Sequence, residues 1–191
     1  MEDPVKQLLL VTALFALAAC SPPAEAPTPS TDIAPTSANI SVPLALSTEA
    51  GPGASIGTVM ISSSAQGAVF TLNLTGLPPG EHGFHLHQTG DCSPAHSDHG
   101  APTPAGAAGG HWDPATTARH AGPDGDGHLG DLPRIIAGAD GRVETTLTAA
   151  RITDIEQLRG RALMVHAGGD NYSDTPENGG GGERLACGVI S

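Results

Sequence analysis

The stretch Ala68-Val69-Phe70-Thr71-Leu72-Asn73-Leu74 alternates bulky apolar side chains with mostly polar ones. Because successive side chains of a strand point to opposite faces, Phe70, Leu72 and Leu74 would face a core while the residues between them face solvent. Seven other apolar runs of strand length lie at 40–46, 56–62, 83–88, 133–137, 142–148, 161–167 and 184–190. Eight short strands predict an all-β protein, either an antiparallel sandwich or a barrel.

The connections between these runs include a tight turn, a short helical segment and two long loops. Ala139-Asp140-Gly141 carries an Asp-Gly turn signal and predicts a hairpin between its flanking runs. Residues 153–158 are the best candidate for a short helical turn. Two connections, 89–132 and 168–183, are too long to be turns, and loops of that length in a compact domain normally carry function or a metal.

Composition narrows the possible partners. The chain of 191 residues has 8 Lys and Arg against 20 Asp and Glu, a net charge of −12. Duplex DNA and anionic membrane surfaces attract basic faces, so we expect no nucleic-acid partner. Seven of the 9 histidines fall in the run 83–88 or the loop 89–132, which directs attention to metal binding.

The N-terminal region predicts an export signal. Residues 8–19 (LLLVTALFALAA) are apolar and follow Lys6. They are too few to span a bilayer, which takes about 20 residues. Leu17-Ala18-Ala19-Cys20 resembles the lipobox of bacterial lipoproteins, which implies a signal peptide at 1–19 and an acylated Cys20. The alternative is a plain secretory signal with an incidental cysteine.

Residues 20–38 are rich in Pro, Ala, Ser and Thr and predict a disordered, extended tether, because they offer little apolar surface to bury. The folded domain would then be 39–191. Glu2, Asp3 and Lys6, the only lysine, precede Cys20, so the mature chain would carry 7 Arg against 18 acids, a net charge of −11. Ser21 favours the outer membrane over the inner one. We therefore expect a lipoprotein anchored in the bacterial cell envelope and facing the periplasm.

Three histidines occur in or at the end of predicted strands. In His85-Leu86-His87 the two imidazoles share one face, so both could bind one metal while Leu86 faces the core. Alone, this pattern is equally typical of two surface histidines. His166 ends the apolar run 162–165 and, alone, is more typical of a core histidine than of a ligand.

A second group lies in the long loop. His111, His120, His128 and Asp131 follow one another at gaps of 9, 8 and 3 in a stretch rich in Gly and Pro. Three imidazoles and one carboxylate are the ligands of a closed tetrahedral zinc site. A loop without regular structure needs such a bound metal to stabilise one conformation. The group therefore predicts a zinc-binding site.

Taken together, the motifs resemble the copper/zinc superoxide dismutases. They are Gly83-Phe84-His85-Leu86-His87, Gly110-His111-Trp112-Asp113-Pro114, His128-Leu129-Gly130-Asp131-Leu132, Val165-His166 and Arg184-Leu185-Ala186-Cys187-Gly188-Val189-Ile190. The stretches 166–174 and 179–182 resemble the bacterial periplasmic branch. The resemblance covers residues 40–191 and implies an eight-stranded Greek-key barrel or sandwich with two long functional loops.

The resemblance also implies a two-metal site. One copper per chain would bind His85, His87, His111 and His166, and one zinc would bind His111, His120, His128 and Asp131. An all-imidazole set suits Cu(II), and a set of three histidines and one aspartate suits zinc. Asp170 would link His85 to His120 and fix their tautomers. The implied activity is that of an oxidoreductase, the dismutation of superoxide to O₂ and hydrogen peroxide by alternating Cu(II) and Cu(I), with His111 bridging the metals.

One further assignment follows from the resemblance and another from the predicted export. Arg184 matches the family's anion-guiding arginine, and a negative chain needs such a local positive focus to attract superoxide. Cys92 and Cys187 are the thiols left to pair once Cys20 is acylated, in a compartment where disulfides persist. We expect them to form a disulfide.

Some questions stay open. The alternation of side chains around the His85/His87 pair does not assign His82 to either face, and we expect His82 to face solvent. His96 and His99 form either an accessory metal-capturing patch or, in the favoured interpretation, a solvated loop. The main alternative function is a non-enzymatic copper- and zinc-binding envelope lipoprotein on the same scaffold. A purely structural β domain is less favoured, because it would leave the histidines unexplained. The chain could be a monomer or a homodimer.

Overall fold

A computed structural model describes residues 39–96 and 101–191. The predictions of a signal peptide, of acylation at Cys20 and of a tether fall outside the described residues, as does His99. Among the residues described, no helix is both long enough and apolar enough to cross a membrane.

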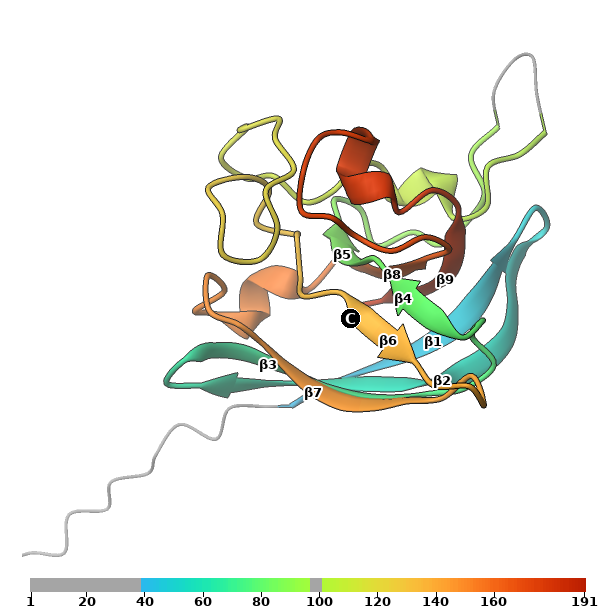
Figure 1. The fold of residues 1–191 in the computed structure, drawn as a ribbon, viewed down its shortest axis with the longest axis horizontal. Coiled ribbons are helices and arrows are strands. Elements are labelled where there is room, and N and C mark those ends of the chain that lie inside the picture. The colour runs from blue at the N-terminus through green and yellow to red at the C-terminus, as the bar shows by residue number, and fades with distance from the viewer. Residues whose placement is uncertain (1–38, 97–100) are drawn as a thin grey trace, which may run out of the picture. The chain divides into compact units, whose positions relative to one another are not determined.

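The fold is all-β, as predicted, and the described residues form nine antiparallel strands in two sheets. Seven strands form one sheet in the order β5-β8-β9-β1-β2-β3-β7, and β4 pairs with β6 in the other. Their bounds are β1 Ile40–Thr48, β2 Gly51–Ser64, β3 Gly67–Leu74, β4 Gly80–His82, β5 Phe84–His87, β6 Ile135–Ala137, β7 Val143–Ala149, β8 Ala162–His166 and β9 Arg184–Val189. The large sheet curls, and β4 and β6 lie side by side facing its interior (Figure 1).

The core is built by the alternation that the sequence shows. In β3, Phe70, Leu72 and Leu74 are buried while Thr71 and Asn73 are exposed. Removing these apolar side chains from water is the main force that holds the sheet closed. The last strand, β9, hydrogen-bonds to the first, β1, as well as to β8, so the two ends of the domain are paired.

The predicted strand 83–88 is shorter in the structure. It is preceded by β4, which ends at His82 and pairs with β6, whereas β5 begins at Phe84 and pairs with β8. The chain changes sheet at Gly83, and this resets the alternation of side chains. The expectation that His82 faces solvent is therefore wrong: its ring is buried, with its nitrogens 2.7 Å from the carbonyl oxygens of His166 and Pro78.

The turn at Ala139-Asp140-Gly141 forms, and the Gly141 N–H donates to the Gly138 carbonyl at 2.9 Å. Its flanking strands do not form the predicted hairpin, because β6 pairs with β4 and β7 pairs with β3. The predicted helical turn is present as the 3-10 helix η2, Ile155–Leu158, which the Asp154 carboxylate caps by accepting from the Glu156 N–H.

Both predicted long loops are present. The first joins β5 to β6 and contains the 3-10 helix η1, Gly106–Ala108, and the second joins β8 to β9 and contains η3, Glu177–Gly180. Both loops lie over the end of the sheet formed by β5, β8 and β9 (Figure 1). The expected disulfide is confirmed: Cys92 of the first loop is bonded to Cys187 of β9, with their Cα atoms 5.8 Å apart.

Candidate metal centre

Strand β5 divides its side chains between the core and the loops. Phe84 and Leu86 are in the hydrophobic core, and His85 and His87 face the opposite way. His166, at the end of the neighbouring strand β8, lies with its ring centroid 4.9 Å from that of His85. Strand pairing thus brings three imidazoles together, although His166 is remote in sequence.

His111 completes the group from the first long loop. Its backbone forms an isolated β-bridge with His87, and its ring centroid is 4.1 Å from that of His85. We call His85, His87, His111 and His166 the four-histidine cluster. One nitrogen from each ring lies within 4.8 Å of the others, and all four side chains are buried.

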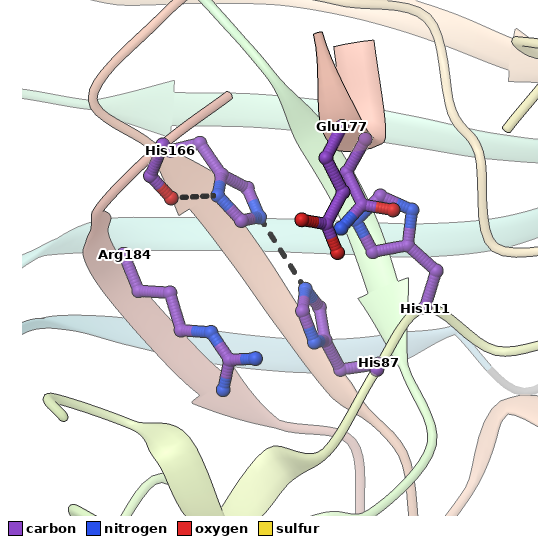
Figure 2. Close-up of a pocket in the computed structure, with 8 residues that line it drawn as sticks. His87, His111, His166, Glu177 and Arg184 are labelled. Carbon is purple, nitrogen blue, oxygen red and sulfur yellow. Dashed lines mark hydrogen bonds between the residues drawn. The ribbon is translucent and has the colours of Figure 1, made fainter. Parts of the chain in front are cut away.

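Each ring of the four-histidine cluster is held by one nitrogen and leaves the other free. The held nitrogens donate from His85 Nε2 to Asp170, from His87 Nδ1 to the Gly109 carbonyl, from His111 Nδ1 to Asp131 and from His166 Nδ1 to the Gly182 carbonyl, at 2.8, 2.9, 2.9 and 3.2 Å. The free nitrogens face one another, and those of His87 and His166 are 3.3 Å apart (Figure 2). His85 Nδ1 and His111 Nε2 are buried without a hydrogen-bond partner.

Burial keeps these rings neutral. It lowers the pKa of His85, lowers that of His87 well below its ordinary value, and lowers those of His111 and His166 to about 4 and about 3. A neutral imidazole is the form that binds a metal, so near neutral pH each ring offers a lone pair. Four such lone pairs fit Cu(II), which favours imidazole nitrogen.

A second group, the His₃Asp cluster, lies beside the first. Its members are His111, His120, His128 and Asp131. A single carboxylate oxygen, Asp131 Oδ1, lies 2.9, 3.0 and 3.3 Å from the Nδ1 atoms of the three rings. The contact with His120 Nδ1 lacks hydrogen-bond geometry and leaves that buried nitrogen without a hydrogen-bond partner. The donor set is the one that tetrahedral zinc takes in closed sites.

The electrostatics of the His₃Asp cluster favour a cation. Burial alone would lower the pKa of His120, but the nearby Asp131 and Asp170 carboxylates outweigh it and raise that pKa to about 9. Burial would raise the pKa of Asp131, yet its contacts with the His111 and His120 rings hold it below its usual range. An ionised carboxylate is thus present at neutral pH. Binding a metal through His120 Nδ1 requires that ring to lose a proton.

Asp170 connects the two clusters. Its Oδ2 accepts from His85 Nε2 at 2.8 Å and its Oδ1 accepts from His120 Nε2 at 2.7 Å. Both bonds keep Nε2 as the hydrogen-bond donor, so Nδ1 is the nitrogen of each ring that points into the clusters. Gly179 makes room for this arrangement: its φ is +72°, and a Cβ there would lie 2.0 Å from Asp170 Oδ1.

A pocket of about 240 Å³ opens onto the four-histidine cluster. His87, His111, His166 and Arg184 contribute to its lining. In Figure 2 the Arg184 guanidinium group lies across the His87 and His166 rings from Glu177. Arg184 is half-buried and donates two hydrogen bonds to backbone carbonyls. The acceptors are Ala105 and Gly109, at 2.6 and 2.7 Å. A fixed cation therefore stands beside the free ring nitrogens.

Two residues of this region have roles that the sequence does not indicate. Glu177 lines the same pocket, but an exposed acid in a loop carries no pattern that would single it out. His82 supports the backbone of His166 by a ring contact, which no alternation rule could reveal across a change of sheet. His96 is exposed and belongs to none of the metal-ligand groups among the described residues.

An all-β domain that places a four-nitrogen site against a His₃Asp site, joined by one histidine and one carboxylate, has the donor sets that suit a protein binding copper and zinc. The family model for copper/zinc superoxide dismutase (SODC) matches residues 55–190, and the chain belongs to this family.

Individual relatives agree with the family match. The chain is 54% identical to "Superoxide dismutase [Cu-Zn]" of Brucella abortus over 141 residues, which cover 73% of this chain and 81% of that protein. It is 50% identical to the Escherichia coli protein of the same name over 150 residues, 78% of this chain and 86% of that one. The solved structure of the Brucella abortus enzyme superposes with a TM-score of 0.78 at 50% identity and covers 81% of this chain and all of its own.

Proposed function

We propose that this chain converts superoxide to O₂ and hydrogen peroxide at the four-histidine cluster. Copper would be held by His85, His87, His111 and His166, and zinc by the His₃Asp cluster. The observation that carries this proposal is the set of four converging imidazole nitrogens, three of whose histidines line a pocket together with Arg184. When bound, the copper supplies one-electron redox chemistry between Cu(II) and Cu(I), and the zinc supplies structural order and positive charge.

The protein's own groups prepare the site for this chemistry. His111 is the shared residue, because its Nε2 faces the four-histidine cluster while its Nδ1 faces Asp131. Asp170 holds His85 and His120 in one orientation. The narrow pocket admits small molecules only, and Arg184 gives it a positive charge that attracts an anion.

Replacing Arg184 with alanine is expected to lower the rate of superoxide removal about tenfold at low ionic strength and to weaken its salt dependence. The mature chain would carry a net charge of −11, so its overall field repels the anion and the local positive charge of Arg184 has to offset that repulsion. Both metals should stay bound, because no side-chain atom of Arg184 belongs to either cluster. The measurement is the second-order rate constant across a series of ionic strengths.

Two variants make the result specific. Arg184→Lys keeps the charge and should retain more of the rate than Arg184→Ala. Arg159→Ala removes the same charge from an exposed pair with Glu156 and should behave as the wild type. Unchanged kinetics of Arg184→Ala at low ionic strength would refute the assignment.

The alternative is a protein that stores or delivers copper and zinc without catalysis. Metal analysis of the purified protein, followed by a superoxide-removal assay with and without copper, separates the two functions. The proposed enzyme should bind one copper and one zinc per chain and remove superoxide only when copper is present. A fully loaded protein without activity would favour the binding function. The enzymatic function is favoured because Arg184 and an open pocket serve a substrate, whereas storage needs neither.

We also propose that the enzyme is a lipoprotein of the bacterial envelope that faces the periplasm. The support is the apolar run 8–19 followed by Leu17-Ala18-Ala19-Cys20, together with a disulfide that persists in oxidising compartments. Cell fractionation should find the wild type in membranes. Cys20→Ser should abolish lipid labelling, and labelling that persists in this variant would contradict acylation at Cys20.

A further inference from the structure

Arg134 lies outside both metal clusters, just before β6, and yet its side chain reaches the loop that carries Asp170. One guanidinium nitrogen donates to the Asp170 main-chain carbonyl at 2.9 Å. The guanidinium carbon lies 5.2 Å from the centroid of the Tyr172 ring, a cation–π distance. The contact with Glu81, at 3.4 Å, joins two partly exposed groups and contributes little.

Tyr172 is tied to Arg134 a second time. Its hydroxyl oxygen accepts from the Arg134 backbone N–H at 3.1 Å, so both the main chain and the side chain of Arg134 contact this residue. The ring also packs against Gly122 in the first long loop, where a Cβ would lie 2.6 Å from the ring. The Tyr172 side chain is thus fixed between two segments.

The backbone of Tyr172 adopts an unusual conformation that directs its N–H to Asp170. Its φ is +61°, a left-handed conformation that a bulky residue adopts only when its surroundings impose it. In this conformation its N–H donates to Asp170 Oδ1 at 2.8 Å. The same oxygen accepts from His120, and the other oxygen accepts from His85.

Asp170 is therefore held at two points by groups that do not bind metal. Arg134 holds its main-chain carbonyl, and the Tyr172 N–H holds its carboxylate. A shift of Asp170 would turn the rings of His85 and His120 together, because each donates its Nε2 proton to that carboxylate. Side chains that support metal ligands in this way tune affinity without touching the metal.

We propose that Arg134 and Tyr172 form a clamp that positions Asp170 and thereby sets how firmly zinc is retained. This inference rests on the proposed assignment of zinc to the His₃Asp cluster. Arg134 is a positioning residue, because it acts through Asp170 on His120.

The test is the rate at which zinc leaves the copper- and zinc-loaded protein in an excess of a chromophoric zinc chelator. Arg134→Gln should release zinc roughly three to ten times faster than the wild type, near the lower end of the effect known for groups that support metal ligands. Arg134→Lys should lie between the two, because an ammonium group can donate to the Asp170 carbonyl but cannot stack as a planar group. Tyr172→Phe removes only the hydroxyl acceptor and should have a smaller effect.

Arg142→Gln is the matched control, because it removes the same charge from an exposed position just before β7, where Arg142 pairs with Glu144, and it should release zinc at the wild-type rate. The unfolding midpoints of the metal-free proteins separate positioning from general destabilisation, and Arg134→Gln should leave that midpoint close to the wild-type value. The clamp would be overturned if Arg134→Gln released zinc at the wild-type rate. It would also be overturned if Arg142→Gln released zinc equally fast, or if Arg134→Gln lost as much stability without metal as its faster zinc release implies. A wild-type protein without zinc would instead overturn the site assignment on which the clamp rests.

Discussion

Replacing His166 with alanine should lower superoxide removal by more than about 100-fold while the protein keeps its zinc. The variant deletes one of the four free nitrogens, and His87 Nε2 loses the ring nitrogen that lies 3.3 Å away. The His₃Asp cluster contains no atom of His166, so its ligands are unchanged. The measurements are copper and zinc content and the second-order rate constant of the loaded variant.

His96→Ala is the matched control for this experiment. His96 is an exposed histidine that lies outside both clusters, and its removal should leave metal content and rate unchanged. If His166→Ala kept full activity with copper bound, the four-histidine cluster would not be the catalytic site.

Replacing both Cys92 and Cys187 with serine should lower the free energy of unfolding by roughly 4–5 kcal/mol. The disulfide closes a loop with a sequence separation of 95 residues, so its removal releases a large amount of chain entropy in the unfolded state. The two sulfurs also belong to a small buried cluster with Ala105 and Met164, which serine hydroxyls would disrupt. Denaturant unfolding of the metal-free proteins gives the difference directly.

The metal-free comparison matters because bound metals also stabilise the folded state. Wild-type protein treated with a reductant should lose a similar amount of stability, which separates loss of the bond from any effect of the serines. A double variant that unfolds at the wild-type denaturant concentration would show that β9 and the first loop are held together by other contacts.

Local patterns predicted much of the fold. Strand β3 has the alternation of its sequence, and η2 forms where the predicted helical turn lies. What local patterns could not predict was the partner of each strand. The Asp-Gly turn before β7 forms as expected, but β6 pairs with β4, because pairing is decided by contacts between distant segments.

In the candidate site, too, local sequence patterns predicted some features and missed contacts between distant segments. The His85/His87 pair was visible as two residues on one strand face, and all the predicted ligands of both clusters do converge. The supporting contacts were not visible, since Arg134 meets Asp170 across 36 positions of sequence and donates to a backbone carbonyl that any residue would provide. Motifs record side-chain chemistry, whereas contacts with backbone atoms leave no signature in the sequence.

The copper assignment is tested most directly by the electron paramagnetic resonance spectrum of the protein loaded with zinc and Cu(II). Nitrogen couplings in that spectrum count the imidazoles bound to the copper. We expect four nitrogen ligands in the wild type and three in His166→Ala. A wild-type spectrum with fewer than four nitrogens, or one unaltered by loss of His166, would contradict the proposal that these four rings form the copper site.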